Sequence, residues 1–574
     1  MSLLTRVRRL PPWGPEAVRN DPPASGHTDR TTSEDAGTAP RRAPAIRAGL
    51  ATALAAAVVL LVLTAPYDFG RLTPGAFVRI PLEALLVVAL LLALPRRGGR
   101  LVALLAGVVL GLLGLLKLLD LGFSASLGRA FDLVLDWALL DEGFAFLSES
   151  YGRPAAIGAA VALALIVALP LLVTLAVLRL SRLLVRHHTG TTRVVAALVV
   201  VWVVCAVSGL RVAPGVPVAD TSATTLANGH GFQVRLRLDD RRTFGATIGA
   251  DAFRDKPGDQ LLTALRGKNV VVAFVESYGR DAVEDPEFAP QVGAVLDSGT
   301  ERLRAAGFAA RSGFLTSPTF GGGSWLAHAT LLSGLWIDND QRHRTLLASD
   351  RMTLNRAFQR ANWQTVGVMP AVSRAWPEGA FFGYDRFYDA HKLAYRGPKF
   401  SFGTMPDQYT LTSWQRLEQG KRGGAPTMTE LALVSSHAPW TPVPPMMDWT
   451  DVGDGAIFGA GGDPATNDGR RSTTRIRADY RHSIEYTLGT LISYVQTYGD
   501  DDLVFVFLGD HQPATVVTGE NASHDVPITI IARDPAVLDR ISGWGWQDGL
   551  RPGPQAPVWR MDAFRDRFLT AFGP

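Results

Sequence analysis

Cysteine is almost absent from this chain, because the only one among 574 residues is Cys205, inside an apolar run. A disulfide framework and a cysteine-based zinc site are therefore both excluded. Cys205 itself is most simply a small apolar residue of a helix. A large excess of charge of either sign is missing too, since the formal net charge is +4. This balance does not suggest a nucleic-acid partner.

Apolar residues are abundant instead, at 47% of the chain, which predicts a membrane protein. Five segments within residues 48–210 approach the roughly 20 apolar residues that a spanning helix needs. They are 48–65, 76–94, 101–119, 155–178 and 194–210. Residues 1–47 are polar and lack periodicity, so we expect a disordered tail. This tail is too long and too polar to be the n-region of a signal peptide.

The arginines predict the orientation of these segments. Arg is frequent in the tail, between the second and third segments, and between the fourth and fifth, but scarce in the other two loops. By the positive-inside rule the N-terminus is cytoplasmic. An odd number of spans then places everything after Arg211 outside. We therefore expect a multi-pass plasma-membrane protein with an extracytoplasmic C-terminal domain.

Two features lie near the predicted membrane surface. Residues 124–152 alternate apolar and acidic groups, which fits an amphipathic helix on the outer interface or an ordinary polar loop helix. Lys117 and Asp120 close the third segment. We interpret them as side chains that reach the interface rather than as a proton path.

The C-terminal half predicts a separate α/β domain. Residues 211–250 are polar, with Pro, Gly and Thr, and are expected to form a linker. Residues 251–574 are enough for one large domain. Strand-like and helix-like stretches alternate there, which is typical of βαβ units and a mostly parallel sheet. Examples are helix 349–361 before strand 364–369 and helix 474–498 before strand 501–508, whereas Gly-rich residues 453–469 favour a surface loop.

Four short apolar runs of this domain lie next to residues that can bind a metal or a phosphate. Runs 270–275, 431–434 and 503–508 precede Glu276, His437 and Asp510-His511, and run 526–531 follows His524. Such runs are typical of strands buried on both faces of a parallel sheet. Because ligands bind outside the carboxyl ends of parallel strands, we expect one site here.

Glu276, Asp510 and His511 are candidate ligands of one divalent cation. A strand end holds a carboxylate rigidly, and Gly509 and Pro513 permit a turn that brings Asp510 and His511 to one ion. This mixed oxygen and nitrogen set suits zinc, manganese or magnesium. The alternatives are a capping or ion-paired Glu and a turn Asp beside a surface His.

Ser324 is a candidate nucleophile. It follows three glycines, and the apolar residues after it predict a tight loop that opens a helix. A helix N-terminus favours an anion, and a Ser on a metal could attack phosphorus. A plain N-cap Ser is the alternative. Thr330, further along the same helix, is a weaker candidate.

His437 and His524 could hold phosphate oxygens or protonate a leaving alkoxide. A loop His can also be only a surface residue. Trp376 could line the site or belong to the core. Four other histidines lack this placement and are interpreted as structural or solvent-facing: His328, His343, His391 and His482.

In their order along the chain, these elements resemble the sulfatase-like branch of the alkaline phosphatase superfamily. The elements are Val275-Glu276-Ser277-Tyr278, the Gly-rich loop with Ser324, Ser436-His437-Ala438-Pro439, Gly509-Asp510-His511, and His524 before Pro527. Five spans before such a domain are similar to lipoteichoic acid synthase and related membrane phosphoglycerol and phosphoethanolamine transferases.

The resemblance implies that Glu276, Asp510, His511 and the Ser324 hydroxyl bind one divalent metal. It also implies that His437 and His524 contact the transferred phosphoryl group. Ser324 would then attack the head-group phosphate of a lipid such as phosphatidylglycerol and release diacylglycerol. An acceptor hydroxyl of an envelope glycan or lipid would take the group from the phospho-Ser intermediate.

Departures from these families bear on the substrate. The transferases usually carry Thr as the nucleophile, whereas this chain has Ser. Glycerol-phosphate polymerases have a His after the strand that matches 364–369, where this chain has Pro370-Ala371. The cysteine-type sulfatase motif is absent, because Cys205 is the only cysteine.

Three functions therefore remain open. The first is a membrane phosphotransferase. A phosphodiesterase or other hydrolase shares the first half-reaction and uses water as the acceptor. A non-catalytic, membrane-anchored binding protein is the third, but it would be expected to have lost a metal ligand, and all of them are present.

Overall fold

The computed structural model describes residues 42–66, 73–137, 139–140, 143, 153–213, 216–400, 405–419, 424–461 and 472–574. The chain forms two compact units, Met1–Ala51 and Thr52–Pro574. Apart from the start of helix α1, the features below belong to the second unit. Most of the predicted tail lies outside the described residues, and its last residues already belong to helix α1, which begins at Arg42.

Among the residues that the structure describes, four helices are long and apolar enough to cross a membrane. They are α1 (Arg42–Thr64), α3 (Arg96–Leu127), α5 (Arg153–Arg186) and α6 (His188–Ser208). The prediction of a fifth such helix over 76–94 is wrong, because α2 covers only Leu82–Ala93. Twelve residues make about 18 Å of helix, against about 30 Å of hydrocarbon. Pro81 and Pro95, which flank α2, limit its length.

The end of α3 is polar and buried. Lys117 is 4% exposed and donates to the carbonyl oxygens of Val62 (2.9 Å) and Leu63 (3.1 Å), near the end of α1. Asp120 is 1% exposed and lies 3.0 Å from His230. The interpretation of both as side chains reaching the interface is therefore wrong. Lys117 binds backbone carbonyls that have no helical partner at the end of α1.

The polar stretch 211–250 is not an irregular linker. It contains strands β2 (Arg211–Ala213), β3 (Val216–Pro217) and β4 (Ala219–Asp220), and the long helix α7 (Ser222–Gly249). Strand β4 pairs with β1 (Ile80–Pro81). Most described side chains of α7 are exposed, so the helix has no apolar stripe that periodicity could reveal.

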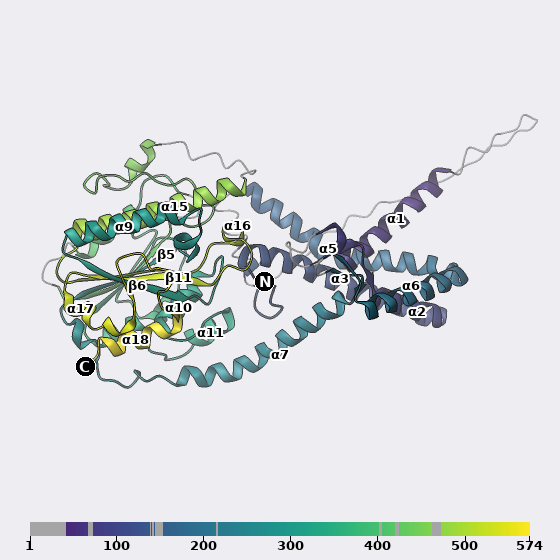
Figure 1. Cartoon of the computed structure of the whole chain (residues 1–574), viewed down its shortest axis with the longest axis horizontal. Helices are drawn as coiled ribbons and strands as arrows, with labels where there is room; N and C mark the ends of the chain where they lie inside the picture. Colours follow the sequence, from purple (N-terminus) through teal and green to yellow (C-terminus); the bar gives the residue numbers. More distant parts are fainter. Residues whose placement is uncertain are drawn as a thin grey trace, which may run out of the picture. The chain divides into compact units, whose positions relative to one another are not determined.

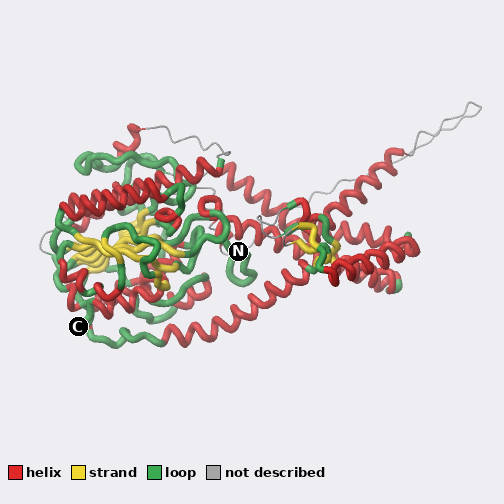
Figure 2. The backbone as a smooth tube through the Cα atoms, in the orientation of Figure 1, coloured by secondary structure: helices red, strands yellow, loops and turns green. Residues whose placement is uncertain are grey.

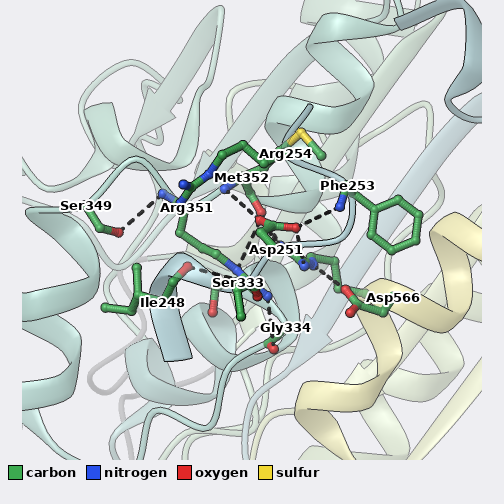
Figure 3. Close-up of polar contacts among 12 residues, drawn as sticks. Ile248, Asp251, Phe253, Arg254, Ser333, Gly334, Ser349, Arg351, Met352 and Asp566 are labelled. Carbon is green, nitrogen blue, oxygen red and sulfur yellow. Dashed lines mark hydrogen bonds and ion pairs between the residues drawn. The ribbon is translucent and has the colours of Figure 1, made fainter. Parts of the chain in front are cut away.

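Two buried arginines, Arg351 and Arg565, hold Asp251, which lies two residues after the end of α7. Figure 3 shows Asp251 beside Arg351. Arg565 binds both carboxylate oxygens of Asp251, at 3.1 and 3.0 Å. Arg351 lies 3.3 Å from Asp251 and donates to the carbonyl oxygen of Ser333 (2.9 Å). These contacts join three distant segments of the chain through one charged cluster.

The C-terminal domain has three layers, with a sheet between two layers of helices (Figures 1 and 2). The strand order is β12-β6-β11-β10-β5-β9-β7-β8, and β13 pairs with β6. The strands are β5 (Asn269–Val275), β6 (Ala309–Thr316), β7 (Gln364–Met369), β8 (Arg386–Asp389), β9 (Thr427–Leu433), β10 (Leu503–Gly509), β11 (Asp525–Ala532), β12 (Gln547–Asp548) and β13 (Val558–Arg560). The predicted α/β domain with a mostly parallel sheet is confirmed.

Helices cover both faces of this sheet. Figure 1 shows α9 and α15 on one face and α10 and α18 on the other. The helices are α8 (Asp281–Glu284), α9 (Ala289–Ala305), α10 (Ser324–Ser333), α11 (Asp340–Leu347), α12 (Leu354–Arg360), α13 (Gly379–Phe382), α14 (Asp407–Trp414), α15 (Thr473–Tyr498), α16 (Thr515–Thr518), α17 (Pro535–Asp539) and α18 (Phe564–Ala571). Alternate strand residues enter two separate cores, one on each face.

One of the four site strands runs against the others. Strands β10, β5 and β9 are parallel neighbours, so their carboxyl ends meet at one edge. Strand β11 is antiparallel to β10, which corrects the prediction of four parallel strands. Because of this reversal the start of β11, with His524 before it, lies at the edge where the other three strands end.

Candidate active site

Glu276 ends β5 and is followed by a tight turn. Ser277 has a φ of 57°, which is unusual for a residue with a side chain. This turn lets the Ser277 N–H donate to Asp510 Oδ1 at 2.8 Å, while the Ser277 hydroxyl donates to Glu276 Oε1 at 2.8 Å. Ser436, after β9, donates to the Glu276 carbonyl oxygen at 2.6 Å. Three strand ends are thus tied together around Glu276.

Asp510 and His511 follow β10 directly. A Cβ atom at Gly509 would collide with the carbonyl group of Tyr278, so glycine allows the two strand ends to approach. Asp510 Oδ1 also accepts from the His511 N–H at 2.7 Å. His511 Nδ1 lies 2.7 Å from the Gln512 carbonyl oxygen and donates to it, so Nε2 is the ring nitrogen that faces the two carboxylates.

Glu276, Asp510 and His511 form one buried cluster, as predicted. Their side chains each offer a ligand atom within 4.8 Å of the others. His511 Nε2 is 3.4 Å from Glu276 Oε1 and 3.7 Å from Asp510 Oδ2. Within the described residues, the ion pairs of these carboxylates are with His511 alone. Two buried carboxylates beside one imidazole favour a bound cation, and the mixed donors fit zinc, manganese or magnesium.

The charges of the cluster are coupled. Burial raises the pKa of Asp510, and the negative charge of Glu276 raises it further. Burial also opposes ionisation of Glu276, but the positive charges of His437 and His511 outweigh it and hold the pKa of Glu276 below its ordinary value. The His511 pKa is raised, because the two carboxylates outweigh its burial. A proton and a metal ion would therefore compete for the same side-chain atoms of this cluster.

Ser324 lies against this cluster. Its hydroxyl donates to Glu276 Oε2 at 3.0 Å, and its Oγ is 3.2 Å from His511 Nε2. It is the first residue of α10, preceded by three glycines with φ of 70°, 157° and 80°. The predicted loop and helix are confirmed, and the side chain is partly exposed. Ser324 can thus reach both the metal ligands and an incoming substrate.

Thr330 is not a nucleophile in this structure. It is 0% exposed, and its hydroxyl oxygen accepts from the Ile337 N–H at 3.0 Å. The side chain secures the turn after α10 instead, so the weaker prediction is wrong.

His437 and His524 both lie at the same edge of the sheet. His437 follows β9, and its positive charge acts on Glu276. His524 is exposed before β11, with its ring 5.4 Å from that of Phe320, in the loop before Ser324. Contact of these two histidines with a phosphoryl group stays a prediction.

Trp376 belongs to an aromatic cluster. Its ring stacks on Phe382 at 5.8 Å and lies 6.2 Å from Tyr384 and 5.3 Å from Phe387. Packing accounts for this residue, and contact with a substrate stays a prediction.

Three supporting residues were not recognised from the sequence. Ser277 and Ser436 act on the backbone or carboxylate of the cluster, as described above. Asp407, at the start of α14, accepts from the N–H groups of Val434 (2.8 Å) and Ser435 (3.1 Å) and so fixes the loop that leads to His437. Only the Ser-Ser-His sequence after β9 could have pointed to part of this arrangement.

Comparison with known proteins agrees with this arrangement. Residues 268–528 match the family model described as Sulfatase. This part of the chain is a sulfatase-like enzyme domain. The match confirms the resemblance to the sulfatase-like branch and spans every predicted ligand from Glu276 to His524. No curated protein sequence matches the chain.

Several solved structures are distantly similar. The lipoteichoic acid synthase LtaP from Listeria monocytogenes is 15% identical, over 54% of this chain and 73% of that chain, with a TM-score of 0.37. The C-terminal periplasmic domain of EcEptC from Escherichia coli is 12% identical, over 53% and 82%, with a TM-score of 0.36. The phosphoglycerol transferase GacH of Streptococcus pyogenes is 11% identical, over 58% and 91%, with a TM-score of 0.33. Likenesses of this size say nothing about substrate.

Proposed function

We propose that the sulfatase-like domain is a metal-dependent phosphotransferase that moves a phospholipid head group, phosphoglycerol or similar, through a phospho-Ser324 intermediate to an envelope acceptor. The observation that carries this proposal is the position of Ser324. Its Oγ lies 3.0 Å from Glu276 and 3.2 Å from His511, two of the three candidate metal ligands. A nucleophile beside a metal site at a helix N-terminus is suited to attack on phosphorus.

In this mechanism Glu276, Asp510, His511 and Ser324 would hold one divalent cation, and that ion would stabilise negative charge on the Ser324 oxygen and the phosphoryl group. The Ser324 Oγ–P bond forms while the bond from phosphorus to the diacylglycerol oxygen breaks. The hydroxyl proton passes toward Glu276 Oε2, its acceptor in the structure. His437 or His524 gives a proton to the leaving alkoxide. The acceptor hydroxyl then repeats the displacement at phospho-Ser324.

A lipid donor is supported by the contacts of the membrane helices with the nucleophile loop. Thr515 donates to the Ala125 carbonyl oxygen near the end of α3 at 2.7 Å. A Cβ atom at Gly128, just past α3, would lie 3.1 Å from the ring of Phe320. The loop that leads to Ser324 therefore packs against the end of a membrane-type helix. We also propose that this side is extracytoplasmic, as the arginine distribution predicts.

The test is mass spectrometry of the full chain in lipid nanodiscs with Mn²⁺ and either phosphatidylglycerol or phosphatidylethanolamine. We expect a mass increase on the peptide that contains Ser324, and its size identifies the head group. Ser324→Ala should remove the adduct, whereas Ser298→Ala, at an exposed position on α9, should keep it. Asp510→Asn should reduce both Mn²⁺ binding and the adduct.

Two results would contradict the proposal. No bound metal and no adduct with either lipid would leave only an anchored binding protein. Bound metal without an adduct would exclude both lipids as donors. An adduct that decays in water as fast as it passes to any added acceptor would instead support the phosphodiesterase alternative.

A further inference from the structure

A second polar side chain, the partly buried His328, lies on α10, one helical turn after Ser324. His328 Nδ1 is 2.8 Å from Glu430 Oε1, and Glu430, in the middle of β9, is 1% exposed. The other oxygen of Glu430 accepts from the Tyr384 hydroxyl at 2.6 Å and from Asn355 Nδ2 at 3.3 Å. Three polar side chains thus surround one buried carboxyl group. The contact between Nδ1 and Glu430 fixes the orientation of the His328 ring.

His328 also fixes α10 along the sheet. Its ring stacks on Phe274 of β5, with 3.6 Å between centroids and 15° between planes. Phe274 comes two residues before Glu276, and His328 comes four residues after Ser324. Four helical residues rise about 6 Å and two strand residues about 6.6 Å. The pairs Ser324–Glu276 and His328–Phe274 are thus in register, and a slip of α10 by one residue breaks both.

Apolar side chains of α10, such as Leu326 and Leu331, pack in the core, and His328 adds a directed polar contact near the N-terminal end of the helix. Three glycines at positive φ precede the helix, and such residues restrict backbone direction least. At its other end, Arg351 holds the carbonyl oxygen of Ser333 (Figure 3). His328 is the polar side chain of α10 that ties the first turns of this helix to the strand next to β5.

We propose that His328, oriented by Glu430, is a positioning residue that sets the place of Ser324 against Glu276 and His511. This inference rests on the proposed nucleophilic role of Ser324. It assigns a function to a histidine that sequence reasoning left as structural. In this view the two parts of the site are positioned separately. Helix α10 carries the nucleophile, and the strands carry the metal ligands Glu276, Asp510 and His511.

The test compares two replacements with different losses. His328→Phe keeps a ring on Phe274 but loses the donor to Glu430. His328→Asn keeps a donor close to the place of Nδ1 and loses the ring. The control is His482→Phe, the same replacement at an exposed position of α15. Each full-length variant is assayed in nanodiscs for Ser324 phosphorylation by bis(p-nitrophenyl) phosphate, for steady-state kcat and KM, and for Mn²⁺ affinity.

We expect His328→Phe to lower kcat and the Ser324 phosphorylation rate by about 10- to 100-fold, because displacement of about 1 Å costs that much. KM should change less than about twofold, and Mn²⁺ affinity should fall far less than the rate, because three of the four predicted metal ligands lie on β5 and β10 and only Ser324 is displaced. His328→Asn should recover most of the lost rate. His482→Phe should match the wild type.

The outcomes separate this inference from the proposed function. A normal phosphorylation rate in His328→Phe refutes the positioning role alone. Loss of Mn²⁺ affinity in parallel with rate, or no recovery in His328→Asn, also refutes it and shows a general structural role. Absence of any Ser324 adduct in the wild type refutes the proposed function and this inference together.

Discussion

Asp407 shows how one buried carboxylate supports the site without touching it. Its Oδ1 accepts from the N–H groups of Val434 and Ser435, and its Oδ2 accepts from the Thr487 hydroxyl at 2.7 Å. Burial raises the pKa of Asp407 to about 6, although these donors oppose the rise. The unfolded chain has a pKa of about 3.9 at an Asp. Between these values the folded protein binds more protons than the unfolded chain.

The sign of the pH effect follows from this difference. The contribution of Asp407 to the free energy of unfolding falls as pH rises from about 4 to about 6. At higher pH the ionised carboxylate destabilises the folded state by up to about 3 kcal/mol. Asp407→Asn keeps an acceptor for the two N–H groups and cannot ionise. Its Tm relative to wild type should therefore be higher at pH 7.5 than at pH 5, measured by thermal unfolding in detergent.

The exposed control is Asp297→Asn, on α9, whose Tm difference from wild type should not change between the two pH values. An Asp407→Asn variant with the same Tm difference at both pH values would show that Asp407 ionises with an ordinary pKa in the folded protein.

At the scale of elements, the sequence predicts those strands and helices whose buried residues recur in a regular pattern. Strand β7 has the predicted bounds, 364–369, and α15 begins one residue before the predicted helix 474–498. The direction of β11 was not predictable, because a strand buried on both faces has the same pattern in either direction. Helix α7 was missed because its apolar residues form no continuous stripe and it contains glycines such as Gly229 and Gly231.

The residues of the candidate site also fall into two groups, those that the sequence predicts and those that it does not. Side chains that bind an ion are chemically distinctive, so Glu276, Asp510 and His511 were predicted. Ser277 was not, because it works through its backbone N–H and a positive φ. The role of His328 was hidden as well, since it depends on the register between α10 and β5, which only the packed structure defines.

The cluster around Asp251 belongs to the element scale, because it joins the segment after α7 to α10 and α18. The side chains of Arg565 and Asp251 are both 0% exposed. Removing one partner of a buried ion pair leaves an uncompensated charge and costs about 3–5 kcal/mol. Arg565→Ala should therefore lower the Tm of the full chain by several degrees.

The matched control for this prediction is Arg560→Ala. Arg560 pairs with Asp562 at 2.7 Å, but its side chain is 59% exposed, so its loss should cost at most about 1 kcal/mol. Equal Tm values for both variants in thermal unfolding would show that the Asp251 cluster does not hold these three segments together.

At the scale of the whole chain, the number of membrane crossings decides where the enzyme acts. Helix α2 is too short to span alone, yet the residues before it and after it lie at opposite ends of α3. Arg79, just before β1, donates to the Thr64 carbonyl oxygen at the end of α1. Lys117, roughly 30 Å along α3 from Arg96, contacts the same end of α1. Residues 79–96 therefore return the chain from the end of α1 to the start of α3.

The arginine distribution predicts five crossings, and α2 with the residues before it would then have to make the second one. The single native cysteine makes a labelling test simple. In a Cys205→Ala background, we expect a membrane-impermeant maleimide to label Thr73→Cys and Ser298→Cys in intact cells. Pro95→Cys should react only after the cells are permeabilised. All three positions are exposed in the structure.

Each alternative topology gives a different labelling pattern. If α2 does not cross, Thr73→Cys and Pro95→Cys will react under the same conditions. If the orientation is reversed, Pro95→Cys alone will react in intact cells, and the sulfatase-like domain will be cytoplasmic. An envelope acceptor would then be out of reach of Ser324, and the proposed transfer would have to end on a cytoplasmic acceptor or on water.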